Sequence, residues 1–206
     1  MSEWRRWITA DALKAQWRWH ESGRQGPGRL VLEGKDLRGL ERIAHLRGVR
    51  LVRCDLTGAR LPALLEDIEL VGCVLDRADL GGAALDRARI DDCRFAGAHL
   101  DLAKFRDAQV RLGSFAGSRM ENGSWRGASV TGVDFAEAQM PGIELDEAVF
   151  RDCDFQRARI VRNRPVFEDK GTAYGTRFEG CDFRGADVDG LRMRGTVFDG
   201  CRLAGT

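Results

Sequence analysis

The chain has 206 residues, and its 33 Lys and Arg nearly balance 32 Asp and Glu, giving a formal charge of +1. This balance argues against recognition of nucleic acid or an acidic membrane surface through net charge. The sequence contains no apolar run long enough to cross a membrane and no signal-peptide core near its start, so we expect a cytoplasmic protein with reduced thiols and no membrane contact.

The first predicted element is a helix in the stretch TADALKAQWRWHESG. Thr9 suits its N-cap and Gly23 its C-terminal end. Leu13, Trp17 and His20 share one face of this helix. We expect that face to pack on the first coil of the structure that follows.

The next segment repeats every five residues. From Leu65 to Ile160, each fifth residue is large and apolar, twenty times in succession. Neither a helix, with its period of 3.6, nor a strand, with its period of 2, produces this spacing. The residue two places before each large one is usually Ala, Cys or Gly, and the others are mostly polar. Two residues of each five therefore face inward and three face outward.

This pattern resembles the pentapeptide-repeat family, whose motif is often written A(D/N)Lxx, as in ADLGG at 78–82 and ADVDG at 186–190. The resemblance covers about residues 43–205. It implies an all-β fold, a right-handed quadrilateral parallel β-helix with four five-residue sides per coil and an N-terminal α-helical cap. We expect residues 1–29 to form the cap and its connector, and residues 30–206 the β-helix.

A four-sided coil stacks residues that are twenty apart, and the aromatic residues agree with this. Leu75 is followed at that spacing by Phe95, Phe115, Phe135 and Phe155. If one unit lacks a residue near Pro62 and eight residues are inserted after the unit of Ile160, all six cysteines fall in the same column. We interpret these thiols as small buried hydrophobic groups rather than a metal or redox site.

Acidic and basic residues alternate along two neighbouring outer columns. A charge pattern that a partner reads is one interpretation, but we favour a lattice of weak, solvated ion pairs. The columns are Glu66, Asp86, Arg106, Arg126 and Asp146, and beside them Asp67, Arg87, Asp107 and Glu147.

Residues 161–175 interrupt the repeat, and we expect them to form a projecting loop. Loops on rigid scaffolds often carry function, so this loop is the predicted contact for a protein partner. Its predicted binding residues are Arg162, Asn163, Arg164, Pro165, Phe167, Glu168, Asp169, Lys170 and Tyr174.

The last repeats place Met193, Phe198 and Leu203 at the C-terminal end of the β-helix, with no polar cap after them. Apolar side chains and unpaired strand edges favour association. A two-fold interface uses one surface twice and closes on itself, so we expect a homodimer through these C-terminal ends.

The sequence shows no P-loop, nucleophile-elbow or metalloprotease motif, and we assign no catalytic, metal-binding or cofactor-binding residue. The resemblance implies a non-catalytic binding protein, because some members of the family bind DNA gyrase and related topoisomerases and protect them from quinolones or toxins. We therefore expect a gyrase-interacting or topoisomerase-interacting protein without direct contact to nucleic acid. The alternative is a structural adaptor or self-assembling scaffold for another protein partner.

Overall fold

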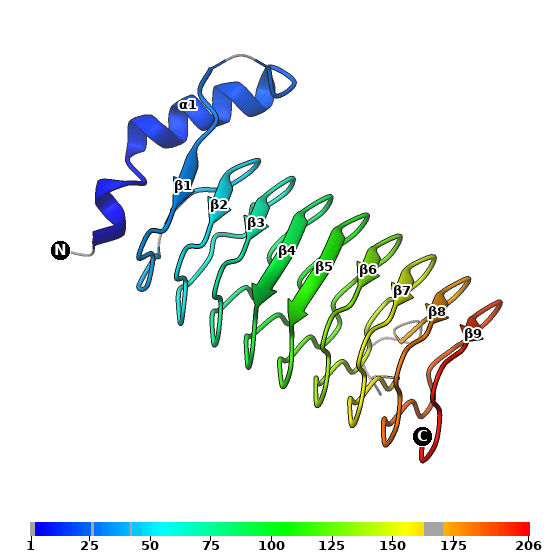
Figure 1. The fold of residues 1–206 in the computed structure, drawn as a ribbon. Helices are drawn as coiled ribbons and strands as arrows, with labels where there is room; N and C mark the ends of the chain where they lie inside the picture. The colour runs from blue at the N-terminus through cyan, green and yellow to red at the C-terminus, as the bar shows by residue number, and fades with distance from the viewer. Residues whose placement is uncertain (1–2, 26, 42, 163–170) are drawn as a thin grey trace.

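The computed structural model describes residues 3–25, 27–41, 43–162 and 171–206, and it is a rod of stacked coils with the two termini at opposite ends (Figure 1). A 3-10 helix η1 (Glu3–Arg6) and an α-helix α1 (Ala10–Glu21) precede nine parallel strands that pair in chain order. This confirms the predicted parallel β-solenoid with an N-terminal helix. The strands are β1 (Val31–Glu33), β2 (Arg50–Val52), β3 (Glu69–Val71), β4 (Arg89–Arg94), β5 (Gln109–Ser114), β6 (Ser129–Thr131), β7 (Val149–Arg151), β8 (Arg177–Glu179) and β9 (Val197–Asp199).

Each coil has four sides. The strands form one side, and three ladders of single parallel bridges run along the others. We name the sides after one feature of each, in chain order around the coil. They are the strand side (β1–β9), the cysteine side (through Val74 and Arg94), the His99 side (through Asp79 and His99) and the helix side (through Ala84 and Lys104).

Tight turns explain why the repeat pairs a large residue with a small one. The N–H of Ala78 donates to the carbonyl oxygen of Leu75 over 3.0 Å. Arg77, the third residue of that turn, has a φ of 55°, which is typical of a type II turn. The large residue thus begins a corner and the small residue three places later ends it, and both point into the coil. The corner resets the inward position every five residues.

The interior is a continuous stack of apolar side chains. Phe95, Phe115 and Phe135 are each 0 % exposed. Their rings lie parallel, with centroids 4.4 Å apart for the first pair and 5.4 Å for the second. At one corner a side chain is excluded, because a Cβ on Gly113 (φ +87°) would lie 2.0 Å from the carbonyl oxygen of Cys93.

The coil lengths agree with the predicted register. Glu69 pairs with Arg89, twenty residues on, but Arg50 pairs with Glu69 after only nineteen, as the missing residue near Pro62 predicts. The first coil is also one residue short, since Val31 pairs with Arg50. That was not predicted, because the repeat is irregular there.

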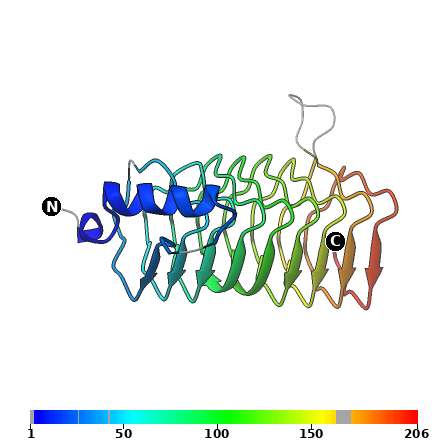
Figure 2. The same cartoon turned by 90° about the horizontal axis from the view of Figure 1, so that it is seen from above.

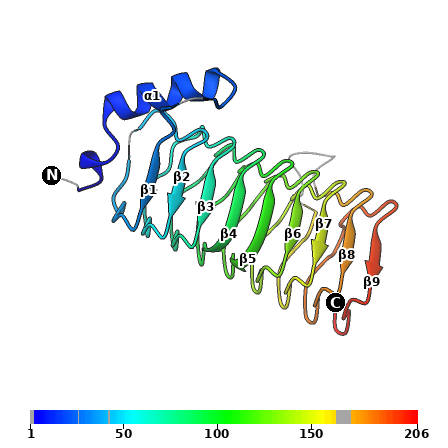
Figure 3. The same ribbon diagram turned by 45° about the horizontal axis from the view of Figure 1, so that its top comes forward.

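The helix begins as predicted but packs differently. The N–H of Ala12 donates to the Thr9 hydroxyl over 3.1 Å, which confirms the N-cap. The predicted packing face is wrong in part: Gln16 and Trp19 are the buried residues, whereas Trp17 is 39 % exposed. The reason is that α1 runs lengthwise beside the first coils instead of across their end (Figures 2 and 3).

The N-terminal end of the rod is covered by the segment before α1. Trp4 is 3 % exposed and Ile8 is 4 % exposed, and both belong to the same apolar cluster as the coils. The indole N–H of Trp4 also donates to the carbonyl oxygen of Gly39 over 3.0 Å. This cover consists of two apolar anchors that the sequence analysis did not identify.

The interruption in the coil is narrower than the predicted range of 161–175. Val161 is 5 % exposed, and its carbonyl oxygen accepts from the N–H of Gly142 as in a regular coil. Thr172 bridges both Glu144 and Arg192 on the helix side, so the coil has already resumed there. The pairing of Phe150 with Phe178 confirms the predicted insertion of eight residues.

Candidate functional site

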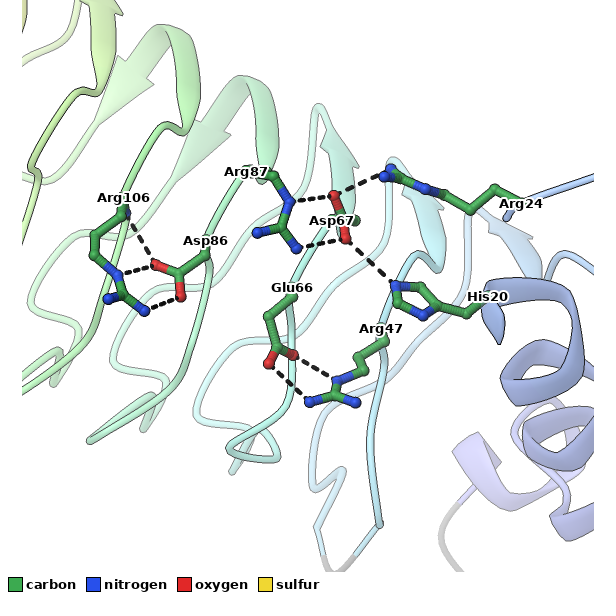
Figure 4. A network of polar contacts seen from close by, with 8 residues as sticks. All are labelled: His20, Arg24, Arg47, Glu66, Asp67, Asp86, Arg87 and Arg106. Atoms are coloured by element: carbon green, nitrogen blue, oxygen red, sulfur yellow. Dashed lines mark hydrogen bonds and ion pairs between the residues drawn. The ribbon is translucent and has the colours of Figure 1, made fainter. Parts of the chain in front are cut away.

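A concentrated polar site surrounds Asp67 at the end of α1 (Figure 4). Its carboxylate accepts two hydrogen bonds of 3.0 Å from Arg87 on the next coil. His20 donates to it over 3.3 Å and Arg24 contacts it at 3.0 Å. We call these four residues the Asp67 cluster. It ties the C-terminal end of α1 to the helix side of the rod.

The Asp67 side chain is only 4 % exposed. Burial alone would raise the pKa of this carboxyl, but hydrogen bonds from Arg87 and His20 outweigh it and leave the pKa below its ordinary value. Asp67 is therefore charged at neutral pH and satisfied by its cationic neighbours. This differs from the solvated pairs expected at this position.

Two further pairs continue the network along the helix side (Figure 4). Arg47 donates to Glu66 over 2.8 and 2.9 Å, and Arg106 donates to Asp86 over 2.9 and 2.7 Å. Each pair joins adjacent coils. The alternation of charge in the outer columns thus serves coil-to-coil pairing.

The coil interruption lies between two surface depressions. One, on the His99 side, has a volume of about 350 Å³ and includes Arg159, Arg162 and Asp187 in its lining. The other, on the helix side, has a volume of about 260 Å³ and includes Asp146 and Tyr174. Both contain acidic and basic groups, which suits polar contacts with a partner.

The structure separates the residues predicted for the partner-binding loop. Arg162 lines the first depression. Tyr174 belongs to the resumed coil, where its N–H donates to Asp146 over 2.8 Å and its side chain is 38 % exposed. Asn163, Arg164, Pro165, Phe167, Glu168, Asp169 and Lys170 lie outside the described residues.

The residues predicted for the dimer end are surface residues of the last coils. Met193 is 44 %, Phe198 36 % and Leu203 46 % exposed. Phe198 stacks on Phe178 with the ring centroids 5.0 Å apart. Inner rings such as Phe115 have a stacked ring on each face.

The cysteine column is assembled as predicted. The thiol of Cys93 accepts from the N–H of Cys73 on the coil before it, and the six thiols are free, with only Cys201 partly exposed. A hydrogen bond with Cys73 and burial raise the pKa of Cys54, which keeps that thiol protonated.

The part of the chain that the structure describes contains neither a metal-ion cluster nor a helix that could span a membrane. No group of three or more His, Cys, Asp or Glu side chains there is arranged to hold a metal ion. No helix there has the length and apolar character needed to cross a membrane.

Sequence reasoning missed the polar side of the α1 interface. Gln16 is 0 % exposed; its amide donates to the carbonyl oxygen of Arg47 and accepts from the N–H of Leu30, both over 2.6 Å. No apolar periodicity marks a buried glutamine. Leu64 was one indication of this interface in the sequence, because it is a large apolar residue at an outward position of the repeat.

Comparison with known proteins identifies the repeat. A family profile described as "Pentapeptide repeats (8 copies)" matches residues 68–107, 128–162 and 174–206. No curated protein sequence matches the chain.

Solved structures with a similar fold include HetL from the cyanobacterium Nostoc sp. strain PCC 7120, described as involved in heterocyst differentiation regulation. It is 21% identical, with 92% of this chain and 91% of that chain covered and a TM-score of 0.35. A structure of QnrB1, a plasmid-mediated fluoroquinolone resistance protein, is 16% identical, with 82% and 84% covered and a TM-score of 0.36. Rfr23 from the cyanobacterium Cyanothece 51142 is 19% identical, with 68% and 92% covered and a TM-score of 0.32. These likenesses concern the fold alone.

Proposed function

Because the chain belongs to the pentapeptide-repeat family, we propose that it is a non-catalytic binding protein that recognises a protein partner through its outer surface. The observation that carries this proposal is the filled interior. The inward columns of Leu and Phe are almost entirely inaccessible, so the described coils have no internal space for a substrate. Recognition then depends on side chains displayed on the four outer sides.

We place the partner contact around the coil interruption. Regular coil contacts are present at Arg162 and again at Thr172. The two polar depressions lie on either side of that point. The contact would combine residues 163–170 with rigidly held groups such as Arg159, Asp187 and Tyr174. A rigid scaffold beside a non-repeat segment is a common arrangement for binding sites.

The most specific form of the proposal takes the partner to be DNA gyrase or a related type II topoisomerase. Its support is the family membership together with an interruption of the coil beside polar depressions. The paired acids and bases on the helix side favour contact with protein surfaces over imitation of the uniformly acidic DNA backbone. The alternative is an adaptor or self-assembling scaffold for a different protein.

A supercoiling assay separates the two. Purified gyrase is inhibited with a fluoroquinolone, and increasing amounts of the protein are added. We expect supercoiling to recover with the intact protein, and not with a variant in which residues 163–170 are an equally long Gly-Ser segment. Absence of recovery and of any effect on uninhibited gyrase would exclude the gyrase form. A partner captured from the source cells by the intact protein but not by that variant would then support the adaptor.

A further inference from the structure

An apolar groove separates α1 from the helix side of the rod, far from the coil interruption. Its volume is about 530 Å³, within the range of small-molecule sites. Its walls are Leu13 and Trp17 from α1, and His45 and Leu64 from the coil. Lys14 and Arg18 stand at its edge. Two separate elements thus form a concave surface with apolar walls and a cationic rim.

The walls of the groove are held in place but remain open. Trp17 meets the ring of His45 edge-on at 5.1 Å, and the guanidinium of Arg47 lies 5.5 Å from the Trp17 ring. Even so, Trp17 is 39 % exposed. An aromatic side chain that its neighbours fix but do not cover is suited to contact an apolar ligand, because little conformational freedom is lost on binding.

Leu64 has an unusual place in the repeat. It belongs to the outward bridge ladder of the helix side, where the following coils carry Ala84, Lys104 and Ser124. Since α1 covers it only in part, its apolar surface faces the groove instead of the protein interior. A ligand with an apolar body would remove this surface from water.

His45, in the wall of the groove, is buried and lacks one hydrogen bond. Its side chain is more than nine-tenths buried, with 6 % exposure, and its Nδ1 has no hydrogen-bond partner among the described residues. Burial, with the nearby charges of Arg47 and His20, lowers the pKa of this imidazole. A neutral ring keeps one donor and one acceptor nitrogen, and a buried polar atom without a partner is costly.

The rim carries positive charge that the described residues pair only weakly. Arg18 makes no ion pair with any residue in the described part of the chain, and Lys14 has only a 3.9 Å contact with the highly exposed Asp11. By contrast, Arg24 and Arg47 nearby are engaged with carboxylates. The positive charges of Lys14 and Arg18 therefore lie at one edge of an apolar surface.

We propose that this groove binds a small amphipathic carboxylic acid, with its apolar body against Leu13, Trp17 and Leu64 and its carboxylate beside Arg18. Apolar walls disfavour a sugar or a nucleotide, and the cationic rim favours an acid over a neutral hydrocarbon. This site is independent of the partner contact at the coil interruption. It gives α1 a role beyond covering the rod.

Decanoate is a suitable probe, titrated below its micelle concentration and followed by calorimetry with the intact protein. We expect saturable binding of one decanoate per chain, and binding of neutral decanol about threefold or more weaker, in line with an exposed ion pair. Decanol binding as tightly as decanoate, or decanoate binding without saturation, would overturn the proposal.

Two variants locate the site. Leu64→Asp puts a charge in the apolar wall and should weaken decanoate binding by about tenfold or more. Arg18→Gln, at an exposed helix position, should weaken it by about threefold. The matched control is Leu102→Asp, which changes an exposed leucine of a later coil and should bind as the unmodified protein does. Circular dichroism and melting temperature verify that each variant is folded. Unchanged affinity in folded Leu64→Asp and Arg18→Gln would place decanoate elsewhere and contradict the proposal.

Discussion

At the scale of single residues, the rod is held by inward side chains that stack on copies of themselves. Phe115 is 0 % exposed and has a parallel aromatic ring on each side. Its removal leaves a cavity that the neighbouring coils cannot close, because their positions are set by continuous backbone pairing.

Phe115→Ala should therefore lower the free energy of unfolding by about 3–5 kcal/mol. The control Arg111→Ala changes an exposed side chain of the same coil and should cost under about 0.5 kcal/mol. Urea unfolding measures both. Equal losses in the two variants would show that the inward column is misassigned.

The Asp67 cluster leads to a pH-dependent prediction. Asp67→Asn keeps the size of the side chain but removes its charge from Arg87, Arg24 and His20, and should cost about 1–3 kcal/mol at pH 7. Because the folded pKa of Asp67 lies below its ordinary value, its stabilising effect is fully present above the unfolded pKa of about 4 and is lost as the pH falls through the folded value.

Urea unfolding at pH 7 and at pH 3 tests this, with Asp107→Asn as the matched control. Asp107 lies in the same outer column two coils further on, is exposed, and has a similar positive φ of 56°. The Asp67 variant should approach the unmodified protein in stability at the lower pH, and the control should differ little at either. A deficit of Asp67→Asn that stays constant from pH 7 to pH 3 would exclude the electrostatic explanation.

At the scale of elements, the sequence predicted what depends on periodicity and missed what depends on docking. The cap at Thr9 and the corners of the coil follow from local chemistry, which a short stretch of sequence contains. The orientation of α1 depends on Gln16 and on the Asp67 cluster, where polar groups meet residues far away in the chain. Such contacts produce no periodic pattern in the sequence.

The same distinction applies to the insertion. Its length followed from the column of cysteines, since only eight extra residues align Cys153 with Cys181. Its edges could not be found that way, because Thr172 and Ala173 do not look like repeat residues but are nonetheless buried in the coil, at 5 % and 0 % exposure. Stacking on complete coils at both sides overrides their weak match to the repeat pattern.

Replacement of residues 163–170 by a Gly-Ser segment of equal length should leave the fold intact. The coil pairs across the interruption without those residues, and loop composition has a small effect on closure entropy. Differential scanning calorimetry should show a melting temperature within about 2 °C of the unmodified protein. A much larger decrease would mean that the segment packs as part of the structure.

At the scale of the whole molecule, the rod has two different ends. Trp4 and Ile8 cover the first coil, whereas Met193, Phe198 and Leu203 of the last coils remain accessible to solvent. Stability in such a solenoid is the sum of contacts between neighbouring coils, and among the described strands β9 pairs only with β8.

We propose that two copies pair through these C-terminal ends. Light scattering coupled to size-exclusion chromatography should give the mass of a dimer at micromolar concentration. Phe198→Glu should yield monomers, because it places a charge in the apolar interface. Leu112→Glu changes an exposed leucine in the middle of the rod and should remain dimeric. A monomeric unmodified protein would contradict the proposal.

We propose above that the rigid rod binds a protein partner around its coil interruption, and an affinity measurement with purified gyrase is the decisive experiment. Calorimetric titration compares the intact protein, the variant with residues 163–170 replaced, and the Arg111→Ala control. We expect binding by the intact protein and the control, with affinity reduced about tenfold or more in the replacement variant. Equal affinity of all three proteins would contradict the placement of the contact at the coil interruption, and no binding by any of them would contradict gyrase as the partner.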